Sequence, residues 1–199
     1  MRSDLSIVLA VTFVLAGCQT AKVAEPITAE LAGNDAESRM AFWHTLGERS
    51  VVSNDEAWHG LLLFVDGEDP AQDYAGRVEL LKARNMLTAG FDRPADEAVR
   101  RGDVAVAICR ILEIKGGVIM RVFGPTPRYA TRELEYEGLY LLSSPHQTLS
   151  GQQFLAIIGR VEDMQRVRGV VVAAGAQVAE PEDTEPPEQD NPADHPGEL

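Results

Sequence analysis

Apolar residues recur at helical spacing along most of the chain, and this periodicity restricts the fold more than any other feature. Phe154, Ile157, Ile158, Val161 and Met164 stand at i, i+3, i+4, i+7 and i+10, which places them on one face of an α-helix. The same pattern, or a weaker form of it, recurs in residues 36–46, 57–65, 74–87, 104–111 and 129–142. The sequence therefore predicts a mainly α fold, with a short strand or extended connector at 117–123 as the exception.

The predicted helices form pairs, and the pairs resemble one another. Each pair has a half-polar helix, a loop and a more apolar helix, and the units span about 36–66, 73–116 and 128–165. The last two align without a gap where Val104–Glu113 matches Phe154–Asp163. Because no unit can bury its apolar helix alone, we expect the three apolar helices to pack centrally, with the others around them. The alternative is that amphipathic hairpins look alike by chance.

The middle unit also carries a motif. Gly90-Phe91 and Pro94 precede Val99-Arg100-Arg101-Gly102-Asp103, which opens the apolar helix. This stretch resembles the S-layer homology (SLH) domain, whose signature is a Gly, a Phe shortly before a Pro, and an Ile-Thr-Arg-small-Glu motif that opens the second helix. Four positions match that motif and one does not, since Arg100 replaces the Thr.

The other two units keep the scaffold but lose parts of the motif. Val52-Ser53-Asn54-Asp55-Glu56 keeps the final acid without the Arg, and Leu149-Ser150-Gly151-Gln152-Gln153 has neither. The resemblance covers most of residues 36–165, and SLH domains commonly occur as three repeats. It implies three helix–loop–helix SLH-like repeats packed as a pseudo-threefold helical bundle.

The resemblance implies a binding site as well. In the family, the motif Arg lies in a groove between repeats and binds acidic cell-wall polysaccharide. A guanidinium takes a carboxylate or phosphate through paired hydrogen bonds, and a neighbouring helix N-terminus favours anions. Arg101, with Arg100 and Asp103 beside it, is the predicted polymer-binding site. The alternative is that Arg101 forms an ion pair with Asp103 or with another helix and serves only the fold.

The amino terminus predicts export and a lipid anchor. Residues 5–16 are apolar but too few to span a bilayer of about 30 Å, so residues 1–17 are expected to be a signal peptide. Leu15-Ala16-Gly17-Cys18 resembles the lipobox of bacterial lipoprotein precursors, which implies a lipid on Cys18 and a membrane anchor. The alternative is a plain secretory signal. Gln19, where an Asp would favour inner-membrane retention, favours the outer membrane. Residues 18–35 are expected to form the lipidated end and a flexible tether.

The charge of the chain argues against one class of partner. Its net charge of −13 repels nucleic acid, so no nucleic-acid partner is expected. Many of the acids lie in the Pro-rich end AEPEDTEPPEQDNPADHPGEL, which contains no Lys or Arg. Such a segment cannot bury enough apolar surface to offset its ordering entropy. We expect a folded domain over 36–170 and a disordered tail over 171–199.

The sequence offers little that catalysis needs. Cys109 lies in an apolar run and is expected to be a buried, free thiol. No His has a His or Cys partner at metal-ligand spacing, and the acidic segment 66–73 lacks the oxygen spacing of a calcium loop, so a solvated loop is expected there. We expect no catalytic residue, metal or cofactor. The predicted function is a non-enzymatic envelope protein that attaches to or organises cell-wall or surface material. The alternative is an envelope protein–protein adaptor that has lost glycan binding.

Overall fold

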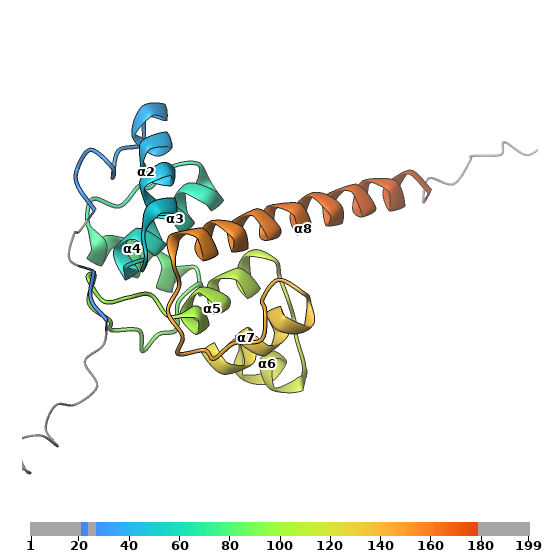
Figure 1. Ribbon diagram of the computed structural model, residues 1–199. Helices are drawn as coiled ribbons and strands as arrows, with labels where there is room; N and C mark the ends of the chain where they lie inside the picture. The colour runs from blue at the N-terminus through green and yellow to red at the C-terminus, as the bar shows by residue number, and fades with distance from the viewer. Residues whose placement is uncertain (1–20, 24–26, 179–199) are drawn as a thin grey trace, which may run out of the picture. The chain divides into compact units, whose positions relative to one another are not determined.

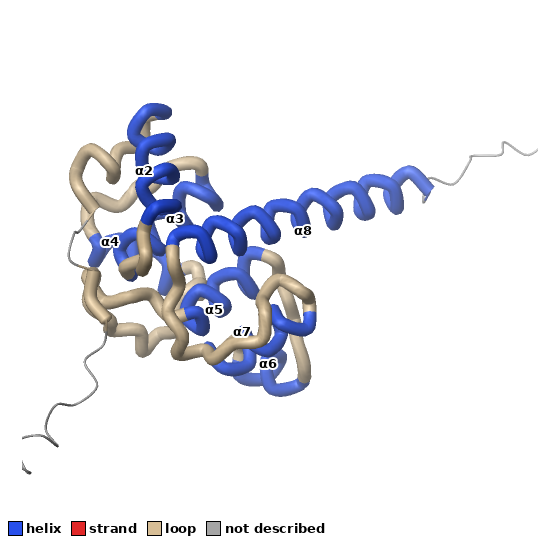
Figure 2. The backbone as a smooth tube through the Cα atoms, in the orientation of Figure 1, coloured by secondary structure: helices blue, strands red, loops and turns tan. Residues whose placement is uncertain are grey.

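The computed structural model describes residues 21–23 and 27–178, and their regular secondary structure is helical (Figures 1 and 2). The helices are α2 (Ala36–Glu48), α3 (Asn54–Asp66), α4 (Tyr74–Ala83), α5 (Arg101–Ile111), α6 (Val118–Phe123), α7 (Pro127–Tyr136) and α8 (Gly151–Val178). No strand occurs in the described part of the chain, so the prediction of a mainly α fold is confirmed. The chain divides into two compact units after Met164, and α8 runs through the boundary.

The start of α3 shows how a local signal fixes a helix. Ser53 is its N-cap, and the Ser53 hydroxyl accepts a hydrogen bond from the Glu56 amide at 3.1 Å. The Glu56 carboxylate in turn accepts from the Ser53 amide at 2.9 Å, which completes a capping box. Gly67, with a positive φ of 79°, ends the helix. The predicted helix at 57–65 is therefore confirmed, and it begins three residues earlier, at Asn54.

Helices α4 and α7 are shorter than the sequence predicted. They end at Ala83 and Tyr136, and a residue in the left-handed region follows each of them, Asn85 with φ 56° and Gly138 with φ 76°. Of the apolar residues beyond these points, Leu87, Leu139 and Tyr140 are buried in loops, whereas Leu141 and Leu142 are exposed. Periodicity alone counts such residues as part of a helical face.

The expectation of a short strand or extended connector at 117–123 is wrong. Val118–Phe123 forms helix α6, which begins after the extended Gly117. A strand needs a neighbour for its backbone groups, and no strand is present among the described residues to provide one. The helix instead satisfies them within itself, as in the bond from the Arg121 amide to the Gly117 carbonyl at 3.1 Å.

The end of the last helix lies further along the chain than the sequence predicted. Helix α8 continues to Val178, so residues 171–178 are helical rather than part of the predicted tail; no proline interrupts the sequence after Gly151 until Pro181. Residues 179–199 lie outside the described residues. Among the described residues, no helix is long and apolar enough to cross a membrane.

Part of the predicted tether pairs with the domain. The Val23 amide donates to the Asp96 carbonyl at 2.8 Å, and the Ala98 amide donates to the Ala21 carbonyl at 2.9 Å. The Lys22 ammonium forms a salt bridge with the Asp96 carboxylate at 2.8 Å. Residues 21–23, which belong to the predicted tether, therefore lie along residues 96–98.

Helix α5 occupies the centre of the larger compact unit, the one that ends at Met164. Every residue from Arg101 to Cys109 is buried, and α5 packs most extensively against α7 (Figure 1). The predicted apolar faces of α3 and α8 supply further fully buried side chains, among them Trp58, Leu61 and Phe154. Burial of one such large side chain contributes about 1.5–3 kcal/mol. The free thiol of Cys109 is buried as predicted.

Three extended segments, one before each of α3, α5 and α8, bond to one another. The Val52 amide donates to the Leu149 carbonyl at 2.9 Å, and the Val99 amide donates to the Val52 carbonyl at 2.8 Å. The Arg101 amide closes the third side by donating to the Gln147 carbonyl at 2.8 Å. Each segment thus contacts both others, and we call this arrangement the closed ring.

Candidate functional site

The three residues of the predicted polymer-binding site lie at the start of α5 but point to different partners. Arg100 is the N-cap residue, and Arg101 and Asp103 lie in the first turn of the helix. The Gly between them has no room for a side chain, because a Cβ on Gly102 would lie 2.8 Å from the Pro127 Cβ. This close packing fixes the start of α5 against the first residue of α7.

Arg100 and Asp103 belong to an ion-pair network of their own. The Asp103 carboxylate accepts from Arg93 Nε at 2.9 Å, while Glu97 accepts from Arg93 Nη1 and from Arg100 Nη2, both at 3.1 Å. Burial raises the pKa of Asp103, and the positive charge of Arg93 only partly offsets this effect. These contacts join the loop before α5 to its first turn, and the carboxylate of Asp103 is used within the fold.

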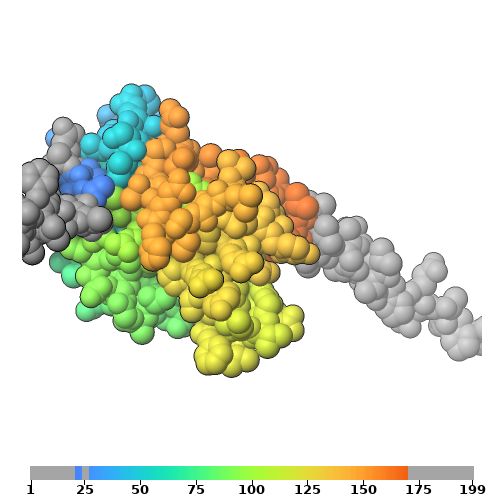
Figure 3. Space-filling model, turned by 60° about the horizontal axis from the view of Figure 1, so that its bottom comes forward, coloured from blue at the N-terminus to red at the C-terminus, as the bar shows by residue number. Residues whose placement is uncertain are grey.

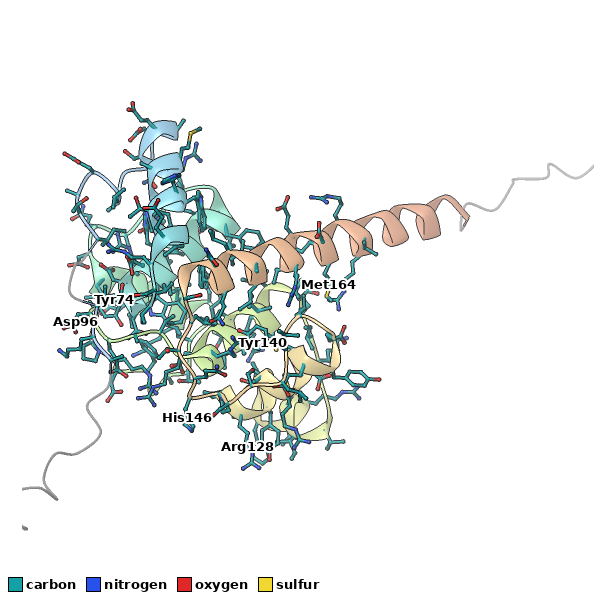
Figure 4. All side chains as sticks on the ribbon, viewed as in Figure 1. Tyr74, Asp96, Arg128, Tyr140, His146 and Met164 are labelled. Carbon is teal, nitrogen blue, oxygen red and sulfur yellow. The ribbon has the colours of Figure 1, made fainter. Side chains whose placement is uncertain are left out.

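Arg101 is held apart from that network. Its side chain is only 6 % exposed, and its guanidinium carbon lies 5.2 Å from the centre of the Tyr140 ring. The Tyr140 hydroxyl donates to the Arg101 carbonyl at 3.2 Å, and Figure 4 shows Tyr140 beside α5. The buried Arg101 Nε has no hydrogen-bond partner among the described residues. The predicted alternative of an Arg101–Asp103 ion pair does not occur, because Asp103 pairs with Arg93.

A small cavity of about 90 Å³ adjoins Arg101. Arg160, on α8, lines the same cavity and donates from Nη1 to the Leu139 carbonyl at 3.0 Å. The other lining residues are Leu139, Leu141, Gln153, Ala156 and Ile157. None of these described lining side chains is acidic, so two guanidinium groups set the charge of the cavity. It has room for about three waters, at roughly 30 Å³ each, or for one small anionic group.

The matching positions of the other two motifs are closed. Asn54 replaces Arg101 at the start of α3, where it is fully buried and donates to the Pro94 carbonyl at 2.8 Å. Gly151 replaces it at the start of α8, where a Cβ would lie 1.6 Å from the Leu46 carbonyl oxygen. No long side chain fits at Gly151. Of the three motif positions, only Arg101 adjoins a described cavity.

A second polar cluster lies between α3 and α4. His59 Nδ1 bonds to an Asp69 carboxylate oxygen at 2.6 Å, and Arg77 Nε donates to the same oxygen. Arg77 also donates from Nη1 to Asp55 at 2.6 Å. The Asn34 side chain accepts from the Asp69 amide at 2.7 Å and donates to the Asp69 carbonyl at 2.8 Å. We call these five residues the Asp69 cluster.

The His59–Asp69 pair at the centre of the Asp69 cluster is sealed from solvent. The side chains of His59 and Asp69 are 0 % exposed, and the Phe42 ring lies edge-on to His59 at 4.6 Å between ring centres. Burial raises the pKa of Asp69, but the hydrogen bonds from His59 and Arg77 outweigh it and hold that pKa below its ordinary value. A substrate has no access to this pair, so the cluster joins α3, its following loop and α4. The prediction of a solvated loop at 66–73 is wrong at Asp69.

Two larger cavities flank α6, with volumes of about 420 and 370 Å³. The larger is lined in part by Cys109, whose thiol pKa is raised to about 12, chiefly by burial. At neutral pH this thiol is protonated and therefore a poor nucleophile. No group of three or more His, Cys, Asp or Glu side chains within the described residues is arranged to hold a metal ion.

Comparison of the chain with protein-family models, curated proteins and solved structures returned no match. The function must therefore be inferred from the geometry of these sites. The sequence located Arg101 through its motif but missed Arg160, which lies 59 residues further along and reaches the cavity only through the packing of α8. The predicted lipidation site, Cys18, lies outside the described residues.

Proposed function

We propose that this protein is a non-enzymatic lipoprotein of the bacterial cell envelope whose SLH-like helical module binds an anionic cell-wall polymer at Arg101. One observation carries the proposal. A buried guanidinium with an unpartnered Nε adjoins a cavity that has a second guanidinium and no acid among its described lining residues. A buried donor without a partner carries a cost of about 1–3 kcal/mol, which a bound anion would remove.

The chemistry of the cavity favours a carboxylate or a phosphate. Arg101 and Arg160 both present planar N–H donors, which match the paired oxygens of these groups. The side-chain N–H groups of Gln153 add donors for a neighbouring hydroxyl, while its carbonyl oxygen accepts from the Ser150 amide. The small volume suits one substituent of a polymer whose remaining length lies outside the cavity.

The closed ring supports the arrangement of three SLH-like repeats. Val52, Val99 and Leu149 hold the same position in the three aligned motifs, and all three are fully buried. Their segments bond in a cycle, as a pseudo-threefold bundle requires. The cap also recurs at the third motif, where Ser150 and Gln153 exchange backbone and side-chain hydrogen bonds as Ser53 and Glu56 do.

The lipid anchor on Cys18 forms the other half of the proposal. The short apolar segment before Leu15-Ala16-Gly17-Cys18 supports a signal peptide that is removed when the cysteine is lipidated. Mass spectrometry of the chain purified from a bacterial membrane should find an amino-terminal cysteine that carries acyl chains. Cys18→Ser should release the chain from the membrane fraction, and an unmodified Cys18 in the native protein would contradict the anchor.

Polymer binding can be tested with the chain from Gln19 to Leu199, which lacks the signal and the lipid. It should co-sediment with cell-wall sacculi that retain their anionic polymers, and less so as salt screens the charges. Arg160→Gln should weaken binding by at least about tenfold, since a charged hydrogen bond is lost. Arg160 is exposed, so this change should leave the fold intact. Arg101→Gln should have the same effect on binding.

Arg100→Gln is the matched control. Arg100 is adjacent to Arg101 in the chain but bonds to Glu97, and it does not line the cavity. Its substitution should leave co-sedimentation unchanged. Equal binding by the Arg160 variant and the wild type, or no binding at low salt, would contradict polymer recognition in this cavity.

A further inference from the structure

Helix α6 presents an exposed apolar face. Val118 is 76 % exposed, Ile119 43 %, Val122 67 % and Phe123 79 %, and we call these four residues the α6 face. Met120, the apolar residue between them, is buried and fastens the helix to the unit. Single exposed apolar residues are common on proteins, but a contiguous group of them marks a contact surface. Figure 3 shows the residues of this region, in yellow-green and yellow, at the surface of the first unit.

Basic residues precede and follow the α6 face in the sequence. Residues 110–132 contain five basic residues and one acidic residue, in a chain whose net charge is −13. The basic residues are Arg110, Lys115, Arg121, Arg128 and Arg132. All five side chains are exposed, and Figure 4 shows Arg128 projecting outward from α7. Lys115, Arg121, Arg128 and Arg132 form no salt bridge or side-chain hydrogen bond with another described residue.

The two larger cavities bring these charges to either side of the helix. Arg110, Lys115 and Arg121 line the cavity of about 420 Å³, together with Glu113. Arg132 lines the cavity of about 370 Å³ with Glu133, beside Val118 and Ile119. The larger cavity therefore has an excess of positive charge next to apolar side chains, whereas Glu133 balances the charge of Arg132 in the smaller one. An amphipathic ligand with a negative head and an apolar body matches this arrangement.

We propose that the α6 face docks the domain on a membrane surface that contains anionic lipids. The four apolar side chains would enter the boundary between headgroups and acyl chains, while the surrounding basic side chains contact lipid phosphates. A helix at a bilayer interface has this composition, with aliphatic and aromatic residues on one side and Lys and Arg around them. The proposal goes beyond the proposed function and shares no residue with the Arg101 cavity.

Other occupants fit the α6 face less well. A second copy of the chain meeting it face to face would bring the unpaired basic residues of both copies together, which like-charge repulsion opposes. The acidic segment 179–199 complements the charge but has almost no apolar residue to cover Val122 and Phe123. The acidic residues elsewhere in the chain do not prevent docking at physiological salt, because charges more than about 8 Å away are largely screened.

Vesicle sedimentation tests this proposal with the chain from Gln19 to Leu199, which lacks the amino-terminal apolar segment. We expect it to bind vesicles of mixed phosphatidylcholine and phosphatidylglycerol, and to bind pure phosphatidylcholine vesicles more weakly. Replacing Val122 and Phe123 together by Asp should reduce binding to the mixed vesicles at least about tenfold, because the inserted side chains are lost. Arg121→Gln should reduce it about fivefold, the effect expected for one cation near an anionic surface.

Met40→Asp is the matched control, since Met40 is an exposed apolar residue on α2, outside the α6 face. It should bind like the wild type, and circular dichroism should show the same helix content for all variants. The proposal is overturned if the wild-type chain binds neither vesicle. It is also overturned if the Val122 and Phe123 double variant binds like the Met40 variant.

Discussion

Asp69 is a buried charged residue that needs partners inside the fold. Its carboxylate has no exposed surface and accepts hydrogen bonds from both His59 and Arg77. Sequence analysis missed this cluster, because the three residues lie on two helices and the loop between them, and no periodic pattern indicates which acid of an acidic loop turns inward. By contrast, the burial of Cys109 could be predicted, since its whole neighbourhood in the sequence is apolar.

Asp69→Asn should destabilise the protein by about 3 kcal/mol. The substitution keeps the shape of the side chain but removes the charge, and Arg77 is left in the interior with less compensation. Urea denaturation followed by circular dichroism would measure the change. Asp66→Asn is the control, because Asp66 forms a partly exposed pair with Arg84 and should cost less than about 1 kcal/mol. Similar losses for the two variants would contradict the importance of burial.

The same carboxylate should make stability depend on acid. The pKa of Asp69 is lower in the folded protein than its ordinary value of 3.8, so its stabilising effect is complete above that value. The effect is lost as the pH falls below 3.8 and through the lower native pKa. Urea midpoints should therefore decline more steeply with acidification in the wild type than in Asp69→Asn. Parallel declines would indicate that other groups carry the acid sensitivity.

Gly151 and Gly159 differ in the space that is available for a side chain. Both lie on α8, but a Cβ at Gly151 would overlap the Leu46 carbonyl, whereas a Cβ at Gly159 meets nothing within 4 Å. Gly151→Ala should destabilise the protein by about 1–3 kcal/mol through overpacking. Gly159→Ala should stabilise it by about 0.5–1 kcal/mol through better helix propensity. Thermal melting of both variants would test the expected opposite signs.

At the scale of elements, the helices that carry their own end signals were the ones that the sequence located best. Ser53 and Glu56 cap the start of α3, and the apolar spacing at 104–111 located α5, which begins three residues earlier at Arg101. The ends of α4 and α7 depend on single left-handed residues, which periodicity does not detect. Helix α6 was missed because six mostly apolar residues are too few to distinguish a helical from a strand period.

Removal of the α3 cap should have a measurable effect on stability. Ser53→Ala leaves the Glu56 amide without its acceptor and should cost about 1 kcal/mol. The denaturation midpoint would shift without a change in slope, because the surface exposed on unfolding stays the same. Ser50→Ala, at an exposed residue just before this helix, should change stability by less than about 0.5 kcal/mol. Equal effects would contradict the role of the capping box.

At the scale of the whole molecule, the closed ring distinguishes this domain from an open array of repeats. In an open array each repeat contacts only its neighbours, so units can be added or removed at the ends. Here the first and last segments, at Val52 and Leu149, bond to each other as well as to the middle one. Removal of any one of the three segments would leave buried backbone groups of the other two unpaired. The compact unit that ends at Met164 should therefore unfold cooperatively.

Cys109 offers a measurement of that cooperativity. It is buried in the centre with a pKa of about 12, so it should resist alkylation by iodoacetamide in the native chain from Gln19, which has no other cysteine. In rising urea, labelling measured by mass spectrometry should follow the loss of helix measured by circular dichroism. Labelling that precedes the loss of helix would show that the centre opens before the molecule unfolds.

The pairing of residues 21–23 with residues 96–98 determines how far the domain can stand from its anchor. If Cys18 carries the lipid, only three peptide bonds separate it from Ala21, the first described residue that bonds to the domain. At most about 3.6 Å per residue, this leash spans roughly 11 Å. Under the proposed anchor, the domain works at the surface of its own membrane, and whatever it binds must come to that surface.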